Sequence, residues 1–265
     1  MERPTKTTLV LFLGGVLLLA GFYVTLRELR TTLELQLADR FVQAVDQLGK
    51  ENLELRLGGI YGLERIANRS EKFYGLSMDI LATYVKEHAR WRDHPASEAV
   101  QPTPKPAADV QAALTVLGRR QRTYRDGESH RLDLRKLDLR RANLDDAHLE
   151  GAILSGAHLE DATFNGAHLE EAILRDAHLE RASFVGAHLE KAFFGGARMD
   201  GALLKEARLE QAYLNGTRLE GANLLGVDLK NVIGLDWEQL KTAKKDNRTR
   251  LPDYLRLPAP APGAR

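Results

Sequence analysis

A histidine followed two residues later by a glutamate recurs every ten residues in the middle of the chain. The five pairs are His148/Glu150, His158/Glu160, His168/Glu170, His178/Glu180 and His188/Glu190. Imidazole and carboxylate groups bind transition metals, and imidazole titrates near neutral pH, so the pairs suggest a metal site or a pH sensor. The alternative is duplication of a ten-residue surface unit, in which each histidine offsets neighbouring glutamates. Because the spacing gathers no ligands from several directions around an open position, we expect charge pairing and no metal site.

Other chemistry is not indicated. The chain has no cysteine, which excludes disulfides, iron–sulfur clusters, thiolate zinc sites and a cysteine nucleophile. Ser155 and Ser183 are isolated hydroxyls, and their spacing implies no base with an orienting acid. No glycine-rich phosphate loop follows a strand pattern. We therefore expect a protein that is not an enzyme and has neither catalytic residues nor a cofactor.

The length and composition favour a folded protein with more than one domain. The chain has 265 residues, of which 43% are apolar, enough for a sizeable core. The 38 basic residues balance 37 acidic ones, which argues against a generally basic nucleic-acid binder. Residues 132–231 hold 12 basic and 17 acidic residues, a net charge of −5. We therefore expect no direct binding to nucleic acid.

Residues 132–231 consist of twenty consecutive five-residue units. From Ala142 to Gly226 the first position is alanine except at Thr217, and the third is leucine, phenylalanine or methionine. A period of five would spread these apolar positions around an α-helix, whereas their alternation within a unit matches a strand. The glycines that recur at the fifth position suit a bend. Each unit is therefore a short strand and a corner, which predicts a β-solenoid with the apolar residues inside.

These units resemble the pentapeptide-repeat family, whose units read A-[D/N]-L-x-x, over about 100 residues without a break. The resemblance implies a right-handed quadrilateral β-helix with four units per coil and thus about five coils. The segment RFVQAVDQLG…LRLGGIYGLERIA also resembles the N-terminal helical module of membrane-anchored bacterial members, whose repeats are cytosolic.

The outward second positions support four units per coil, because residues twenty apart are of one kind. One side carries four apolar residues, here called the apolar ladder: Ile153, Ile173, Phe193 and Tyr213. The other sides carry polar residues with Leu203, or the histidines and arginines. A continuous apolar stripe on a charged surface is typical of a contact surface, so the apolar ladder is our candidate interaction face. The alternative is that its side chains stack on one another and stabilise the sheet.

Upstream of the repeats, Thr7–Leu26 is an uncharged run of twenty residues. It matches the length of a transmembrane helix better than a cleaved signal peptide or a buried helix. Three basic residues follow it within residues 27–40, against two before it, which favours a cytoplasmic C-terminal part. We therefore expect a single-pass protein of a bacterial inner membrane, with its repeat domain in the cytoplasm.

The remaining segments complete the expected organisation. It comprises a transmembrane helix (7–26), a helical module (27–91), a Pro-rich linker (92–108), a short helix leading into the solenoid (109–131), the repeats (132–231), and a C-terminal capping helix and tail (232–265). Within the module, helical patterns cover Leu53–Ala67, where Gly58-Gly59 indicates close packing, and Leu76–Ala89.

The ends of the solenoid also have predicted caps. Asp109 is the expected N-cap of the short helix before the repeats. After them, Asp236 and Gln239 are spaced for a capping box, with Trp237 and Leu240 expected to cover the last coil.

Two functions in different classes follow. The first is a membrane-anchored scaffold whose repeats bind another protein, the protein's own helical module, or a second copy in a homodimer. The second comes from the resemblance, because some family members mimic duplex DNA and modulate DNA gyrase. Histidine and arginine alternate with the glutamates and interrupt the negative field, so the scaffold is the favoured function.

Overall fold

The computed structural model describes residues 33–91, 105–121 and 130–255. The chain divides into two compact units, Met1–Arg69 and Ser70–Arg265. The boundary between the two units falls inside segment 27–91, which we predicted to be a single helical module.

The described part of the first unit is a pair of helices. Residues 33–48 are helical, and α2 covers Leu53–Ala67 as predicted. The Asn52 side chain caps α2 by accepting hydrogen bonds from the N–H groups of Glu54 and Leu55. A Cβ atom on Gly59 would lie 2.6 Å from the carbonyl oxygen of Ala44, so the close packing predicted for this glycine is confirmed.

The second unit begins with α3 (Glu71–His88) and α4 (Ala108–Gly118), which pack against each other. The prediction of Asp109 as N-cap is wrong, because Ala107 holds that position. Asp109 lies inside the first turn, is 3% exposed, and accepts a hydrogen bond of 2.7 Å from the Tyr84 hydroxyl. The carboxylate therefore joins α4 to α3.

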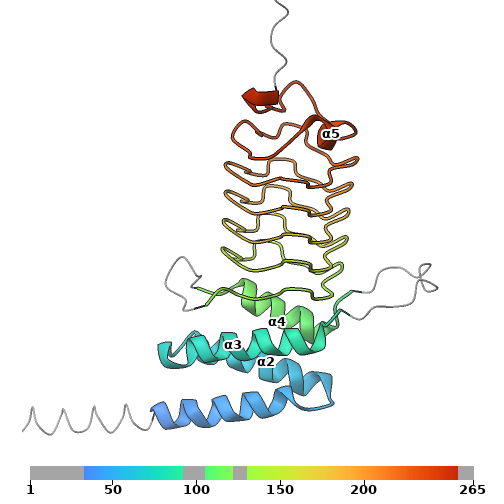
Figure 1. The fold of residues 1–265 in the computed structure, drawn as a ribbon. Helices are drawn as coiled ribbons and strands as arrows, with labels where there is room; N and C mark the ends of the chain where they lie inside the picture. The colour runs from blue at the N-terminus through green and yellow to red at the C-terminus, as the bar shows by residue number, and fades with distance from the viewer. Residues whose placement is uncertain (1–32, 92–104, 122–129, 256–265) are drawn as a thin grey trace, which may run out of the picture. The chain divides into compact units, whose positions relative to one another are not determined.

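Helix α4 covers the first coil of the solenoid (Figure 1). Its last carbonyl, on Gly118, accepts a hydrogen bond of 2.8 Å from the N–H of His148. Gln111 exchanges two hydrogen bonds with the backbone of Asn143, at 2.8 and 3.0 Å. A Cβ atom on Gly118 would lie 2.9 Å from that of Ala147, which shows how closely helix and coil approach. These contacts satisfy backbone groups that an open solenoid end would expose.

The last turn of α3 and the residues that follow it contact the same end. Lys86 forms an ion pair of 3.0 Å with Asp133, and the Ala89 carbonyl accepts a hydrogen bond of 2.7 Å from the Asp138 N–H. Arg90 makes an antiparallel bridge with Leu137. The chain thus pairs with the first coil just before the segment 92–104.

The repeats form a four-sided solenoid with twenty residues per coil. From Asp133↔Ile153 to Tyr213↔Ile233, parallel bridges join every second position except Arg208 to the one twenty residues later. The register predicted from the sorting of side chains is confirmed (Figure 1). Within the coils, alanines and leucines such as Ala167 and Leu169 are 0% exposed, as predicted.

The corners place the fifth residue of every unit but the last at positive φ. Glycine does this at Gly186 (φ 67°) and elsewhere, but ten residues with side chains do so too, including Lys191 (φ 58°). The corner geometry is thus set by the coil rather than by glycine alone.

The C-terminal cap differs in part from expectation. Helix α5 is Trp237–Leu240, and the capping box between Asp236 and Gln239 is confirmed. Leu240 is 0% exposed and covers the core, but Trp237 is 47% exposed, so its predicted covering role is wrong. After α5, Lys244 bridges Asn223 and Arg250 bridges Asp228, 21 and 22 residues on instead of twenty, because the inserted helix shifts the register.

The membrane prediction is corrected. Across residues 33–91, 105–121 and 130–255, no helix has both the length and the apolar character needed to span a bilayer. This finding contradicts the predicted single-pass localisation. The predicted span Thr7–Leu26 lies outside the described residues.

Candidate interaction surfaces of the repeat domain

The structure brings the four residues of the apolar ladder together on one side of the solenoid. Parallel bridges join Ile153 to Ile173, Ile173 to Phe193, and Phe193 to Tyr213. All four side chains are partly buried. The rings of Phe193 and Tyr213 stack, with centroids 4.7 Å apart and planes inclined by 7°.

The apolar ladder extends one coil further than the sequence analysis placed it. Ile233 bridges Tyr213 and is 41% exposed. It was missed because it follows the last complete unit, although the alternation of buried Val232 and outward Ile233 continues the pattern. At the other end the equivalent residue is Asp133. Hydrogen bonds from Arg135 first, and then from Lys86, hold the pKa of Asp133 well below its usual range, so the end is charged.

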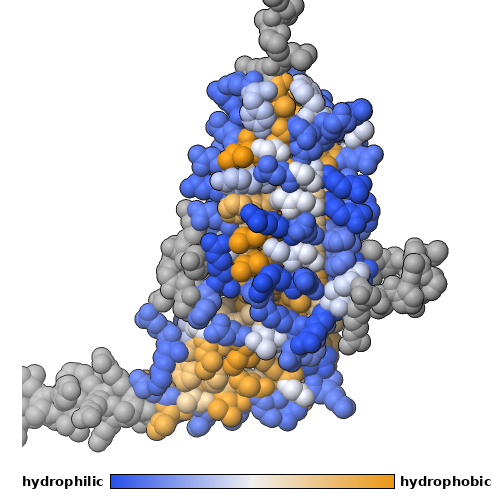
Figure 2. Space-filling model, viewed as in Figure 1, coloured by the Kyte–Doolittle hydropathy of each residue, from blue (hydrophilic) through white to orange (hydrophobic). Residues whose placement is uncertain are grey.

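Small residues flank the apolar ladder. Gly195 and Gly196 lie beside Phe193, and the Arg175 guanidinium lies 5.8 Å from the centroid of the Phe193 ring. In Figure 2, hydrophobic residues recur at successive levels on one side of the repeat region, beside strongly hydrophilic ones. The apolar side chains are therefore accessible between charged neighbours.

Two further sides carry the histidine–glutamate pairs, and on each the pairs of successive coils interlock. One side holds His158, Glu160, His178 and Glu180; the other holds His148, Glu150, His168, Glu170, His188 and Glu190. The Nδ1 atom of His158 lies 3.3 Å from Oε1 of Glu160, and Nδ1 of His178 lies 4.0 Å from the same oxygen. On the other side the corresponding distances to Glu170 are 3.4 Å from His168 and 3.8 Å from His188. Glu160 and Glu170 thus each face the histidine of their own coil and the histidine of the next coil.

The imidazole rings also meet between coils, stacked in the His158 and His178 pair and tilted in the His168 and His188 pair. Ring centroids are 4.2 Å apart for His158 and His178 and 4.5 Å apart for His168 and His188. Trp91 stacks on the free face of His158 at 3.3 Å, with the Arg140 guanidinium 4.9 Å from the Trp91 ring. The sequence analysis missed Trp91 because it lies outside the repeats and carries no periodic signal.

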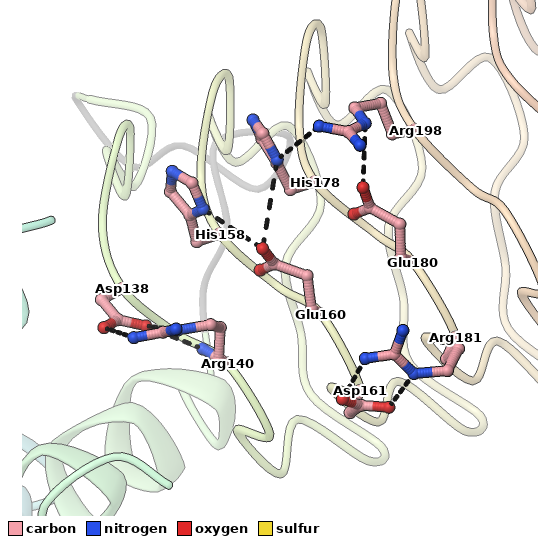
Figure 3. Close-up of polar contacts among 9 residues, drawn as sticks. All are labelled: Asp138, Arg140, His158, Glu160, Asp161, His178, Glu180, Arg181 and Arg198. Carbon is pink, nitrogen blue, oxygen red and sulfur yellow. Dashed lines mark hydrogen bonds and ion pairs between the residues drawn. The ribbon is translucent and has the colours of Figure 1, made fainter. Parts of the chain in front are cut away.

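On the His158 side, Arg198 takes the place of a histidine one coil beyond His178, as Figure 3 shows. Nε of Arg198 lies 2.8 Å from Oε1 of Glu180, and its Nη1 lies 3.5 Å from Nδ1 of His178. The pKa of His178 is lowered, chiefly by burial and then by the charge of His158, against the opposing effect of Glu160 and Glu180. The expected pairing of glutamate with histidine or arginine is confirmed on this side.

The glutamates of the histidine–glutamate pairs do not have all their carboxylate oxygens hydrogen-bonded in the part of the chain that the structure describes. In each of five glutamates, Oε2 is buried and has no hydrogen-bond partner within the described residues: Glu150, Glu160, Glu170, Glu180 and Glu190. A buried carboxylate oxygen without a donor is unfavourable, because its lost hydration is not replaced.

Two groups of three side chains place donor atoms within 4.8 Å of one another: His158, Glu160 and His178, and the equivalent His168, Glu170 and His188. These are donor types that transition metals accept. The sequence analysis found every one of these residues, but not their convergence across two coils.

Comparisons with known proteins agree with this architecture. The family model for pentapeptide repeats matches residues 133–170, 162–201 and 202–233. No curated protein matches the chain.

Solved structures of other proteins are similar to this chain, among them the following three. Rfr23, a pentapeptide repeat protein of the cyanobacterium Cyanothece 51142, is 32% identical over 43% of this chain and 64% of its own, with a TM-score of 0.23. The chain thus spans less than two thirds of Rfr23. The pentapeptide repeat protein alr5209 of Nostoc PCC 7120 is 30% identical over 40% of this chain and 86% of its own, with a TM-score of 0.35. QnrB1, a plasmid-mediated fluoroquinolone resistance protein, is 22% identical over 46% of this chain and 75% of its own, with a TM-score of 0.36.

The family match accounts for the twenty-residue coil and the buried alanine and leucine positions, and it implies a right-handed β-helix. Through residues 133–233, the chain belongs to the pentapeptide-repeat family.

Proposed function

We propose that the protein is a non-enzymatic scaffold whose repeat domain binds another protein chain through the apolar ladder. The observation that carries this proposal is the alignment of five apolar side chains on successive coils, from Ile153 to Ile233. At a spacing of about 4.8 Å between coils, the ladder is about 19 Å tall.

The apolar ladder suits binding because its backbone is already ordered. Every ladder residue from Ile153 to Tyr213 is held by parallel bridges to the coils on both sides. The Phe193 and Tyr213 rings also restrain each other by stacking. A surface ordered before binding loses little conformational entropy when a partner docks.

The charged sides are less suited to this role. Arg181 pairs with Asp161 at 2.7 Å, and Arg198 pairs with Glu180 at 2.8 Å. A partner covering these pairs would have to desolvate them, whereas the centre of a protein interface is usually depleted of charge. The chemistry therefore favours a partner that offers an apolar strip of its own.

The ion pairs also weigh against DNA mimicry. Arg198, Arg208 and Arg218 each lie within 4 Å of an acidic side chain, so the glutamates do not form an uninterrupted negative surface. A DNA supercoiling assay with gyrase and the full chain tests this function directly, and the scaffold proposal expects no inhibition or protection.

The test of the scaffold proposal is the double variant Ile173→Ser/Phe193→Ser in the full chain. Crosslinking in cells and sedimentation should show loss of partner capture or of self-association, while the thermal melt keeps most of its midpoint. The matched control is Leu203→Ser, because Leu203 is also apolar and 42% exposed but lies on another side of the solenoid. If binding survives in the double variant while the melting temperature collapses, the apolar ladder is structural and the proposal fails.

A further inference from the structure

We propose that His168, Glu170 and His188 form a binding site for one divalent transition-metal ion, such as Zn²⁺. The site lies on a different side of the solenoid from the apolar ladder and is independent of the scaffold role. It would use two imidazole nitrogens and one carboxylate oxygen, which leaves a fourth position for water.

The coil geometry brings the three donors together. His168 lies at a bridged strand position and Glu170 lies two residues later, at the start of the corner, where the two side chains meet. His188 lies directly one coil further on, joined to His168 by a parallel bridge. Nδ1 of His168 and Nδ1 of His188 lie 3.4 and 3.8 Å from the same Glu170 oxygen, Oε1.

These distances are close to those of a metal site. Zinc bonds of about 2.0–2.2 Å in a tetrahedral arrangement separate neighbouring donor atoms by roughly 3.4 Å. The three donor atoms lie within 4.8 Å of one another, so small side-chain rotations complete the geometry. The His168 and His188 rings are already inclined by 35°, which is compatible with two lone pairs directed at one ion.

The carboxylate gives a second indication, which Glu170 shares with the other four glutamates of the histidine–glutamate pairs. The Glu170 side chain is only 17% exposed, and its Oε2 is buried without a hydrogen-bond partner in the described part of the chain. A bound cation would compensate such a carboxylate directly. Glu150 and Glu190, one coil away on either side, add negative potential.

In the equivalent triad of His158, Glu160 and His178, neighbouring side chains restrain both histidines. Nη1 of Arg198 lies 3.5 Å from Nδ1 of His178, so a guanidinium competes for the lone pair that a metal needs. Trp91 stacks on His158 at 3.3 Å and restrains the rotation of that ring. Next to His188, the corresponding arginine is Arg208, which faces Glu190 at 3.6 Å. We therefore assign the ion to His168, Glu170 and His188 and not to the His158 triad.

The experiment uses the full chain without an added histidine tag. Zn²⁺ binding is measured by calorimetry, and Co²⁺ by the visible absorption bands that tetrahedral coordination produces. We expect one ion per chain, with affinity at least about tenfold weaker in His188→Gln and in Glu170→Gln. The matched control, His178→Gln in the other triad, should bind as the parent does, and circular dichroism confirms that each variant is folded.

Three results would overturn the assignment. The first is the lack of saturable binding by the parent chain. The second is binding that persists unchanged in both His188→Gln and Glu170→Gln. The third is an equal loss of metal affinity in His178→Gln, which would show that Arg198 and Trp91 do not prevent the His158 triad from binding the ion.

Discussion

The ring of Phe193 lies flat against the ring of Tyr213 on the next coil, with centroids 4.7 Å apart. The two residues therefore support each other as well as forming part of the partly exposed apolar ladder. Such a pair contributes about 0.5–1.5 kcal/mol beyond its buried area, so one substitution can affect both stability and binding. The choice of replacement separates the two effects.

Phe193→Leu should lower the free energy of unfolding by about 1 kcal/mol, because leucine cannot replace the stacked aromatic pair. It keeps an apolar side chain in the ladder, so partner capture or self-association should persist. Phe193→Ser should lower the free energy of unfolding by a similar modest amount, and it should also lose partner capture or self-association. Chemical denaturation and crosslinking measure the two properties, and equal loss of binding in both variants would show that apolar character is not what the partner recognises.

Leu169→Asp should prevent the repeats from folding, because Leu169 is 0% exposed and a carboxylate would enter the narrow core. Glu170→Ala should change the melting temperature of the metal-free protein little. Its Oε1 faces His168, but its Oε2 is buried without a hydrogen-bond partner among the described residues, so these effects oppose each other. Thermal melts of both variants by circular dichroism check the assignment of inward and outward positions, and comparable losses would contradict it.

Gly186→Ala and Gly75→Ala should act in opposite directions. A Cβ atom on either glycine meets nothing within 4 Å, so sterics with neighbours do not distinguish them. Gly186 has a φ of 67°, where an L side chain costs about 1–2 kcal/mol, so its replacement should destabilise the protein. Gly75 lies exposed within α3, where alanine should stabilise by about 1 kcal/mol. Equilibrium denaturation gives both signs, and destabilisation by Gly75→Ala would contradict the helix assignment.

The repeat fold was predictable because its information is local. The buried positions of each unit follow from the alternation of apolar and polar residues, as Leu169 and Glu170 illustrate. The register of twenty residues per coil was predictable because outward residues of the same type recur every twenty positions, as Ile153 and Ile173 do. Such residues lie on neighbouring coils, where their side chains contact each other.

The caps and the details of the candidate sites were not predictable in this way. Asp109 resembles an N-cap in sequence, and only the position of Tyr84 on α3 shows that its carboxylate serves tertiary packing. Trp91 and His158 are 67 positions apart in the chain, so no periodicity connects them. The convergence of His168 and His188 on one Glu170 oxygen likewise depends on side-chain rotamers, which a sequence pattern does not specify.

Tyr84→Phe should lower the free energy of unfolding by about 1–3 kcal/mol, because it removes the hydroxyl that donates a 2.7 Å hydrogen bond to buried Asp109. The loss of stability should appear in the melt of the second unit, because Tyr84 and Asp109 link α3 to α4 within that unit. Tyr61→Phe is the matched control, because the Tyr61 side chain is 47% exposed. Equal stability of Tyr84→Phe and the parent would show that this hydrogen bond does not hold α4 to α3.

The last prediction concerns the pH dependence of stability. The pKa of His178 in the folded protein is lowered from its ordinary 6.5, first by burial and then by His158, while Glu160 and Glu180 oppose the shift and Arg198 adds to it. As pH falls through 6.5, the unfolded chain therefore takes up a proton at this position before the folded protein does. Proton uptake by the unfolded state favours unfolding, so stability should decrease below this pH.

His178→Gln should remove the contribution of this histidine to the pH dependence of stability and leave the contributions of the other titrating groups. The difference in free energy of unfolding between parent and variant should be constant above about pH 7.5 and should shift against the parent as pH falls below the ordinary histidine pKa. Denaturant titrations at a series of pH values, all performed with a chelator so that no metal contributes, measure this difference. A difference that stays constant from pH 8 to pH 5 would show that folding leaves the pKa of His178 unchanged. A shift in favour of the parent at low pH would show that its glutamate neighbours outweigh its burial.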